Sequence, residues 1–415
     1  MTSAVAPDRL VRGGQRESPA LRLALFTDTY PPQINGVSRT LERLANAVRD
    51  RGGEARVYTT TDPQTSAFDP LVWRRASVPF WAYPQLRLAA PVRGAAYRDL
   101  RAWRPTLIHS ATPFGMGLAG RASARTLDVP MVTSYHTSFS EYAKFYRLGA
   151  LSALGWAFFR WFHNSGARTY VPTHAVRAEL EAYGFQRLAI WGRGVETHSF
   201  SPQFRSASWR ERLGADDRTV VVAYVGRLAA EKGLDVALGA MHRLQAFAAA
   251  DASPRIVFGL AGDGPYADYC RRAAPPPPSV HFVGRLTERN LHDFYASADL
   301  FVFPSTTDTF GNVLLEAMAS GLPVIGADVG PTRELLAAGG GVTFPPGDAE
   351  SLASMIRSLA SDPGLRRSLA DRGQAFAATC SWDHIFDDLV EDYRRVVADH
   401  YGSLAGSSVK TGNPT

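Results

Sequence analysis

Short apolar segments alternate with amphipathic segments along almost the whole chain, and this alternation breaks once and then starts again. The first apolar segment is 21–27 (LRLALFT), and others of similar length follow at 55–60, 107–109, 130–134 and 169–172. Buried runs of this length separated by helical segments are typical of parallel sheets covered by helices. The break falls at 190–202 (IWGRGVETHSFSP), where two glycines and a proline predict a hinge.

The pattern resumes after this hinge with apolar segments at 219–226, 256–261, 280–283, 300–304 and 323–326. A chain of 415 residues exceeds the size at which one core stops growing. We therefore predict two α/β domains, 21–195 and 196–384. A final amphipathic helix, 385–403, is predicted to join the first domain. Residues 1–20 and 404–415 are predicted to be a disordered lead-in and tail.

Composition sets the class of protein but not its function. Hydrophobic residues make up 45% and charged residues 20%, which is ordinary for a globular protein. Two cysteines, Cys270 and Cys380, exclude a disulfide framework. The polar N-terminus and the lack of a long apolar run predict a cytoplasmic protein. The net charge of +6 suits phosphate-bearing ligands, anionic lipid or nucleic acid, and a basic solvated surface is the alternative.

Two loops that follow first strands carry residues suited to bind an anion. In the first domain YPPQINGV (30–37) contains Gly36, which would let the backbone approach a ligand, although an ordinary turn is the alternative. In the second domain GRLAAEKG (226–233) places Arg227 and Lys232 five residues apart. An arginine fork and a lysine point charge together suit a diphosphate, and a solvated basic turn is the alternative.

The segment TDTFGNVLLEAMASGLPV (307–324) carries the strongest signal in the chain. Asp308 precedes a predicted helix and Glu316 lies about two turns into it. The segment 310–314 would present unpaired backbone N–H groups at the helix start, where phosphate binds readily. Alternatively Asp308 is an N-cap and Glu316 a surface residue. Glu316 stands in the apolar run VLLEAMA, however, where an idle carboxylate is unfavourable.

Two further features are weaker. His136 follows a short strand of the first domain, where it is predicted to face a cleft between the domains and to hydrogen-bond hydroxyls of a bound ligand. His109 has the same placement after an earlier strand. A lone histidine is more often structural. The segment AGDGPYA (261–267) superficially fits a dinucleotide fingerprint through Gly262 and Gly264. Because Pro265 occupies the turn, we interpret it as a sharp loop lining the nucleotide site.

Taken in order, GRLAAEKG, AGDGP, HFVGRL and TDTFGNVLLEAMASGLPV resemble the C-terminal half of retaining glycosyltransferases of family 4. FTDTYPPQINGVSRTLERLA and SYHTSF resemble the subgroup of GDP-mannose-dependent α-mannosyltransferases and sulfolipid-type synthases. The resemblance covers about 21–400. It implies the GT-B fold, in which two Rossmann-like domains face a central cleft.

The resemblance also implies roles for individual residues. Arg227 and Lys232, after Gly226, would hold the donor diphosphate and Glu316 the ribose. Asp308 takes the first place of the family's E-x7-E motif, and this shorter carboxylate changes the reach toward the donor sugar. Other donor contacts are implied for the loop glycines Gly36, Gly262 and Gly284, for Arg285 beside the base, and for Phe310, Gly311, Asn312, Val313 and Leu314. His136 would lie near the reacting carbon.

The implied reaction is transfer of a hexosyl group, best matched by mannose from GDP-mannose, to a lipid or glycan hydroxyl. No metal, cofactor or nucleic acid is expected. A UDP-sugar-dependent glucosyl or sulfoquinovosyl transferase, a sugar-nucleotide epimerase, a nucleotide-sugar sensor and, most distantly, an NAD dehydrogenase are the alternatives. The aromatic stretch 145–163 would either rest on an anionic membrane at the inner face of the cell membrane or form a buried helix pair.

Overall fold

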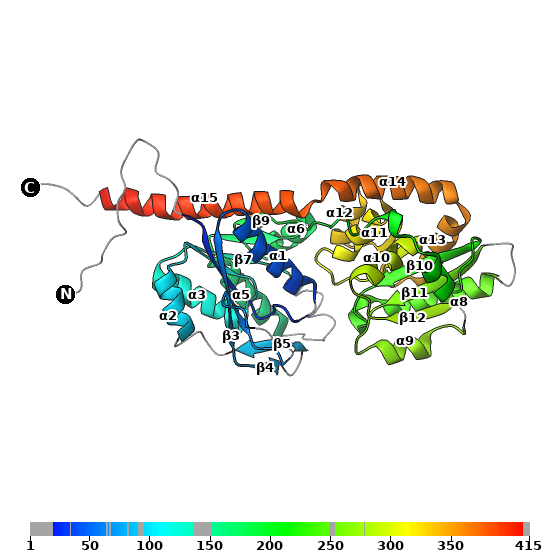
Figure 1. Cartoon of the computed structure of the whole chain (residues 1–415), viewed down its shortest axis with the longest axis horizontal. Helices are drawn as coiled ribbons and strands as arrows, with labels where there is room; N and C mark the ends of the chain where they lie inside the picture. Colours follow the sequence, from blue (N-terminus) through cyan, green and yellow to red (C-terminus); the bar gives the residue numbers. More distant parts are fainter. Residues whose placement is uncertain are drawn as a thin grey trace, which may run out of the picture.

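The structure is a computed structural model, and it describes residues 20–33, 35–63, 65, 68–80, 83–89, 95–136, 151–248, 254–277 and 279–409. Within these residues the chain forms two α/β domains that lie side by side, and a long C-terminal helix runs along one side of the first domain (Figure 1). The predicted α/β class and the two-domain division are confirmed.

The first domain contains a parallel sheet of seven strands in the order β3-β2-β1-β6-β7-β8-β9. The strands are β1 (Arg22–Phe26), β2 (Glu54–Thr60), β3 (Val72–Arg75), β6 (Leu107–Ser110), β7 (Met131–Ser134), β8 (Arg168–Val171) and β9 (Leu188–Ile190). The helices are α1 (Gly36–Asp50), α2 (Ala95–Trp103), α3 (Gly115–Leu127), α5 (Leu151–Asn164) and α6 (His174–Ala182). A separate antiparallel hairpin comprises β4 (Ser77–Phe80) and β5 (Tyr83–Ala89).

The second domain contains a parallel sheet of six strands in the order β12-β11-β10-β13-β14-β15. Its strands are β10 (Thr219–Val225), β11 (Arg255–Ala261), β12 (Val280–Gly284), β13 (Leu300–Phe303), β14 (Val324–Ala327) and β15 (Gly341–Phe344). In both domains the first strand lies next to the fourth strand of its sheet. The chain therefore reverses direction across the sheet at this point, where open α/β sheets bind ligands beyond the carboxyl ends of their strands.

Helices cover both faces of the second sheet and create two hydrophobic cores. They are α7 (Ala207–Arg212), α8 (Leu234–Ala248), α9 (Ala267–Ala273), α10 (Glu288–Ser297), α11 (Asn312–Ala319), α12 (Gly330–Leu336), α13 (Ala349–Ser361) and α14 (Pro363–Thr379), with the 3-10 turns η1 (Pro202–Phe204) and η2 (Ala230–Lys232). The central strands β10, β13 and β14 are short and almost wholly apolar, because they are buried on both faces of the sheet.

The chain passes between the domains twice, once through the predicted hinge and once through the helix α15 (Trp382–Val409). The two crossings touch, since the Val195 N–H donates to the Cys380 carbonyl at 2.9 Å. The apolar face of α15, including Phe386, Leu389 and Tyr393, packs in the core of the first domain. The prediction that the C-terminal helix joins the first domain is confirmed.

The predicted boundaries of this last helix were wrong at both ends. It begins at Trp382 and continues to Val409, so the first six residues of the predicted disordered tail, 404–409, are helical. The apolar periodicity fades after Val397 because small residues follow it, and small residues are nevertheless compatible with a helix that is already nucleated. Residues 410–415 and the predicted lead-in 1–19 lie outside the described residues.

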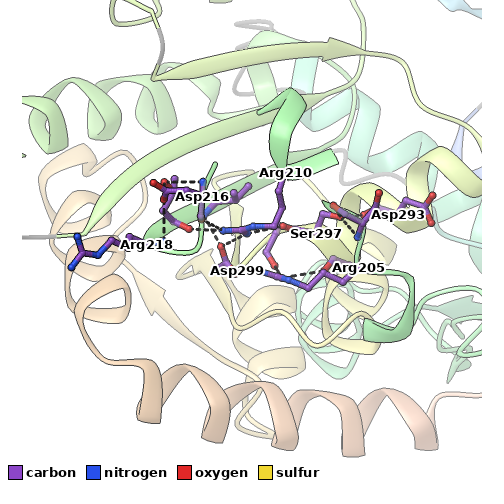
Figure 2. Close-up of polar contacts among 12 residues, drawn as sticks. Arg205, Arg210, Asp216, Arg218, Asp293, Ser297 and Asp299 are labelled. Atoms are coloured by element: carbon purple, nitrogen blue, oxygen red, sulfur yellow. Dashed lines mark hydrogen bonds and ion pairs between the residues drawn. The ribbon is translucent and has the colours of Figure 1, made fainter. Parts of the chain in front are cut away.

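A polar network holds the start of the second domain against the N-terminal ends of the strands of its sheet (Figure 2). Asp299, just before β13, accepts hydrogen bonds from Arg205 at 2.8 Å and from Arg210 at 2.9 Å. It also accepts from the Val221 N–H at 2.8 Å. One carboxylate thus connects η1 and α7 to the N-terminal ends of β10 and β13.

We expect Asp299→Ala to lower the free energy of unfolding by about 2–4 kcal/mol, because it leaves the half-buried Arg210 guanidinium without its anion. Urea titration measures this change. The exposed Asp217, close by in sequence, supplies the control Asp217→Ala, for which less than about 0.5 kcal/mol is expected. Equal destabilisation by the two variants would show that Asp299 does not hold this network together.

Candidate active site

The loops at the carboxyl ends of the two sheets meet at the domain interface. Thr309, in the loop after β13, donates from its hydroxyl to the His136 carbonyl, after β7, at 3.1 Å. Glu334 of α12 accepts hydrogen bonds from the His174 and Ala175 N–H groups, which begin α6, at 3.0 and 2.8 Å. Of the residues selected from the sequence, His136 takes part in the first of these contacts, and Asn312 and Glu316 line a cavity between the domains.

Lys232 and Asp308 form an ion pair between two neighbouring loops of the second domain. The Lys232 Nζ lies 2.7 and 2.8 Å from the two Asp308 carboxylate oxygens. Gly233 makes this approach possible, because a Cβ there would lie 2.4 Å from the Pro304 carbonyl. Burial raises the pKa of Asp308, but Lys232 outweighs that effect and holds the pKa below its ordinary value. Asp308 is therefore anionic, and it is not the cap of α11, a place taken by Gly311.

Arg227, predicted to bind a diphosphate together with Lys232, is also held by a carboxylate. Its guanidinium contacts Glu231, four residues on, whose side chain is only 4% exposed. The Arg227 carbonyl accepts a hydrogen bond from the Tyr224 hydroxyl at 3.0 Å. The structure thus places both cations on one turn, each with its own acidic partner, at the point of the sheet where ligands are expected.

The glycines of the AGDGP loop allow it to pack closely against the loop after β10. A Cβ on Gly262 would lie 1.8 Å from the Gly226 carbonyl, and one on Gly264 would lie 2.3 Å from the Leu228 carbonyl. These glycines let the loop after β11 press against the loop that carries Arg227. The two glycines are thus required by contact between the loops, which agrees with the interpretation as a sharp loop.

Gly284 ends β12 with a positive φ of 73° and open space around it, and Arg285 beside it is exposed. The Gly262 N–H donates to the Gly284 carbonyl at 2.8 Å, which fixes this corner beside the same loop. A role for Gly284 and Arg285 in recognising the base stays a prediction.

Glu316 lies at the wall of a small cavity of about 40 Å³ between the domains. Its Oε2 accepts a hydrogen bond from the Tyr295 hydroxyl at 2.8 Å. Arg39 and Arg43 of α1, together with Asn312, line the same cavity. Burial raises the pKa of Glu316, while Tyr295 and the two arginines oppose that rise. Glu316 is therefore no idle surface carboxylate, which confirms the reasoning from its apolar surroundings.

The start of α11 differs in part from the prediction. Donor contacts were predicted for Phe310 and Leu314, and both side chains are buried in the core, where the loop turns at Gly311, so their backbone alone is left for such a contact. The Leu314 N–H is also not free, since it donates to the Gly311 carbonyl at 2.9 Å. Val313 is half-buried against the same core. Asn312 faces the other domain, with its Nδ2 3.7 Å from the place that a Cβ on Gly36 would take.

His136 lies at the domain interface as predicted, yet both of its ring nitrogens already have protein partners. Nε2 is 2.7 Å from the Ser134 hydroxyl and Nδ1 is 3.1 Å from a guanidinium nitrogen of Arg193. Burial, with Arg193, His109 and His163 nearby, lowers its pKa well below the ordinary value. His109 is fully buried and bonds Tyr393 and Ser134, so the cleft-facing placement predicted for it was wrong.

Sequence reasoning missed Arg39, Arg43, Tyr295 and Arg193. Arg39 and Arg43 were detectable in principle, because they stand four residues apart directly after the glycine loop. Tyr295 and Arg193 had no local signal, since their partners are distant in sequence. Within the described ranges, no group of three or more histidine, cysteine, aspartate or glutamate side chains is placed to hold a metal ion.

We expect Glu334→Ala to loosen the domain interface, because it removes a carboxylate that accepts two N–H groups at the start of α6. A contact of this kind stabilises the observed arrangement of the two domains by about 1–2 kcal/mol, and the variant should lose that amount. Interdomain distances from paired spin labels should broaden toward longer values. The exposed Glu350 at the start of α13 offers the control Glu350→Ala, and an unchanged distribution in Glu334→Ala would contradict this role.

The family models agree with this architecture. Residues 34–199 match Glycosyltransferase Family 4, and residues 206–376 match Glycosyl transferases group 1. A GDP-mannose-dependent alpha-mannosyltransferase of Mycobacterium tuberculosis is 34% identical over 384 residues, which span 91% of this chain and 97% of that protein. A sulfoquinovosyl transferase of Arabidopsis thaliana is 31% identical over 87% of this chain and 71% of its own length.

Solved structures share the fold at lower identity. Sucrose-phosphate synthase from Thermosynechococcus elongatus superposes with a TM-score of 0.71 at 20% identity, covering 91% of this chain and 100% of that chain. Anabaena HepE in complex with UDP and glucose superposes with a TM-score of 0.70 at 21% identity, covering 90% and 99%. The two facing domains are thus a GT-B fold. The chain belongs to family 4 of the glycosyltransferases and uses a nucleotide-sugar donor.

Proposed function

We propose that the chain is a retaining, metal-independent hexosyltransferase that moves mannose from GDP-mannose to a hydroxyl of a lipid or glycan acceptor. The observation that carries the proposal is that Lys232 and Arg227 lie on one loop after β10, while Glu316 lines the cavity between the domains. Three relatives at 28–34% identity over 91% of this chain are named GDP-mannose-dependent alpha-mannosyltransferases. The donor assignment rests on these names.

A UDP-sugar is the second candidate donor. The sulfoquinovosyl transferase relative and the UDP complex of HepE support it. Asp308 also favours testing it, because this shorter carboxylate stands where the family motif has glutamate. In the ligand-free protein both carboxylate oxygens of Asp308 are hydrogen-bonded to Lys232 and not directed to a donor sugar.

In the proposed reaction, the bond between the anomeric carbon and the diphosphate breaks while the acceptor oxygen bonds the same face of that carbon. The acceptor proton passes to the departing phosphate oxygen, so no protein nucleophile and no cofactor are needed. Lys232 and Arg227 stabilise the charge that the diphosphate gains, and each exchanges its acidic partner for phosphate. Glu316 accepts hydrogen bonds from the ribose, and closure about the hinge excludes water.

The test is product analysis with GDP-mannose, UDP-glucose and UDP-sulfoquinovose, each with a diacylglycerol-linked sugar as acceptor. The proposal predicts transfer from GDP-mannose, an α-linked product by NMR, and full activity in EDTA. A β-linked product or loss of activity in EDTA would contradict the retaining or metal-independent mechanism. A new sugar formed without acceptor would indicate an epimerase instead.

We further propose that the first domain rests on the anionic inner face of the cell membrane. Residues 145–150 of the aromatic stretch lie outside the described residues, and the rest forms α5. Phe162 and His163 are buried, but Leu154 and Trp161, two turns apart on the helix, are 70% and 47% exposed. Arg121 stacks on Trp161 at 4.1 Å, which adds a cation beside the apolar face.

A lipid acceptor suits this surface. An alpha-monoglucosyldiacylglycerol synthase of Streptococcus pneumoniae is 29% identical over 74% of this chain and 70% of that protein. No helix among the described residues is both long and apolar enough to span a bilayer. Cosedimentation with phosphatidylglycerol vesicles should capture the protein and fail for Leu154→Ser/Trp161→Ser. Equal capture of both proteins would contradict the membrane assignment and leave the transferase assignment intact.

A further inference from the structure

Five polar side chains form one continuous hydrogen-bonded line through the first domain. Tyr393 Oη lies 2.7 Å from His109 Nδ1, and His109 Nε2 lies 2.8 Å from the Ser134 hydroxyl. That hydroxyl lies 2.7 Å from His136 Nε2, and His136 Nδ1 lies 3.1 Å from Arg193 Nη2. Tyr393, His109, Ser134 and Arg193 are all buried.

The direction of every proton in this line follows from its Arg193 end. A guanidinium only donates, so His136 Nδ1 must accept, and the single ring proton of a neutral His136 resides on Nε2. That N–H donates to Ser134, whose hydroxyl proton then points to His109 Nε2. His109 consequently carries its proton on Nδ1 and donates to Tyr393.

The pKa values of the two histidines agree with these neutral states. Burial, and secondarily Arg193, lowers the pKa of His109 to about 3. The pKa of His136 is lowered well below its ordinary value by burial and by Arg193, His109 and His163, which approach it from the linker, β6 and α5. Neither imidazole is therefore charged at neutral pH.

Arg193 is an unusual residue to bury. Its side chain is 6% exposed and donates to the Trp191 and Gly192 carbonyls at 2.7 and 2.9 Å while it stacks on the Trp191 ring at 4.6 Å. Burial lowers its pKa to about 9, which still leaves it protonated near pH 7. Among the described residues its hydrogen-bond partners are neutral groups, so the cost of burying this charge is not met by an ion pair.

Each of the two segments that connect the domains contributes a residue to this hydrogen-bonded line. Arg193 belongs to the linker, and Tyr393 belongs to α15, which returns from the second domain. A third contact from the second domain, the Thr309 hydroxyl, reaches the His136 carbonyl. The orientation of His136 is thus coupled to the same segments that set how the domains sit.

We infer that Arg193 is a positioning residue for glycosyl transfer. It holds the His136 ring neutral, as the Nε2–H tautomer that donates to Ser134, so that His136 does not act as a base and its carbonyl stays in place for the Thr309 contact across the domain interface. The inference rests on the proposed function for its effect on turnover. The tautomer itself is a property of the ligand-free protein and is testable without substrate.

The test is a two-bond proton–nitrogen NMR spectrum of protein labelled with ¹⁵N-histidine, with His136→Gln to assign the signals. The full-length protein should show His136 as the Nε2–H tautomer without titration from pH 8 to 5.5. Arg193→Met should give mixed tautomers and a titrating His136, and Arg193→Lys should restore the single tautomer. A protonated Nδ1 or a titrating His136 in the wild type would overturn the inference before any variant is made.

Kinetics supply the second readout. Arg193→Met is expected to lower kcat by about 10²-fold with the donor KM changed by less than about 3-fold, and to add an acidic limb to the pH profile. Ser134→Ala, which cuts the line below His136, keeps the Arg193 contact and should keep the wild-type pH profile. If Arg193→Met leaves both the His136 tautomer and the pH profile of kcat unchanged, the inference is contradicted and Arg193 has only a structural role. Absence of any transfer by the wild type would instead contradict the proposed function and leave the tautomer result standing.

Discussion

Lys232→Ala is expected to lower kcat/KM for glycosyl transfer by about 10³-fold while leaving the protein folded. The lysine stands at the switch point of the second sheet, within 2.8 Å of both Asp308 carboxylate oxygens. Its removal takes away a cation that stabilises the leaving diphosphate, an effect that is worth about 10²–10³-fold for a single preorganised donor. The freed Asp308 adds repulsion, because an unpaired carboxylate then faces the phosphates.

The same reasoning specifies the controls. Asp308→Asn in the Lys232→Ala background should recover part of the donor affinity, since it removes the repulsion without restoring the cation. Arg271→Ala removes an exposed arginine of the same domain and should retain wild-type turnover within about 2-fold. Turnover of Lys232→Ala within 3-fold of the wild type, with an unchanged unfolding midpoint, would contradict the assigned site.

A second large effect is expected in the dependence of stability on pH. His109 and His163 are fully buried, and burial lowers the pKa of each to about 3. Because the unfolded chain binds protons below about pH 6.5 and the folded one does not, the stability from each is present above pH 6.5 and is lost as pH falls toward 3. Each contributes a loss of about 1.4 kcal/mol per pH unit.

Asp28 opposes this loss. It is fully buried beside the start of α3, accepts hydrogen bonds from Thr112 and the Met116 N–H, and burial raises its pKa to about 6. Its folded form holds a proton that the unfolded form has released, so its contribution is present below pH 3.8 and is lost as pH rises through 6. His136, whose pKa is also lowered well below its ordinary value by burial, acts in the same direction as His109 and His163. Three histidines against one aspartate leave a net loss of about 2.7 kcal/mol per unit from pH 6 to 5.

Urea titrations at pH 6 and pH 5 measure this slope, and two variants separate its parts. His163→Asn preserves an acceptor for Thr133 and should reduce the loss to about 1.4 kcal/mol per unit in this range. Asp28→Asn removes the opposing group and should steepen the loss to about 4 kcal/mol per unit. A wild-type protein that becomes more stable from pH 6 to pH 5 would show that these histidines are not buried in their neutral form.

The sequence predicted the architecture far better than the contacts between residues distant along the chain. Apolar runs such as 219–226 are too short and too uniform to be anything but buried parallel strands, and Lys232 and Glu316 follow from their places after such strands. The pairing of Lys232 with Asp308, 76 residues on, depends on β10 lying beside β13. Strand order is a global property, so no local pattern revealed it.

The same limit explains the larger omissions. Tyr393 and His109 stand 284 residues apart and meet only because α15 returns to the first domain. The sequence analysis predicted that the last helix joins the first domain, but it did not predict which side chains would be in contact. The burial of the Phe310 and Leu314 side chains was likewise not predictable, because an apolar residue beside a glycine turn fits a ligand site and a core equally well, and the turn at Gly311 decides between them.

The most direct test of the central claim, a nucleotide-sugar donor held at the domain interface, is thermal unfolding of the purified protein with added ligands. A ligand that binds only the folded state raises the unfolding temperature by mass action. We predict that GDP-mannose and GDP raise it, that UDP compounds and NAD do so less or not at all, and that Lys232→Ala and Glu316→Ala abolish the rise. A rise with UDP-sugars alone would reassign the donor. A rise with NAD and none with any nucleotide sugar, or an undiminished rise in both variants, would contradict the account.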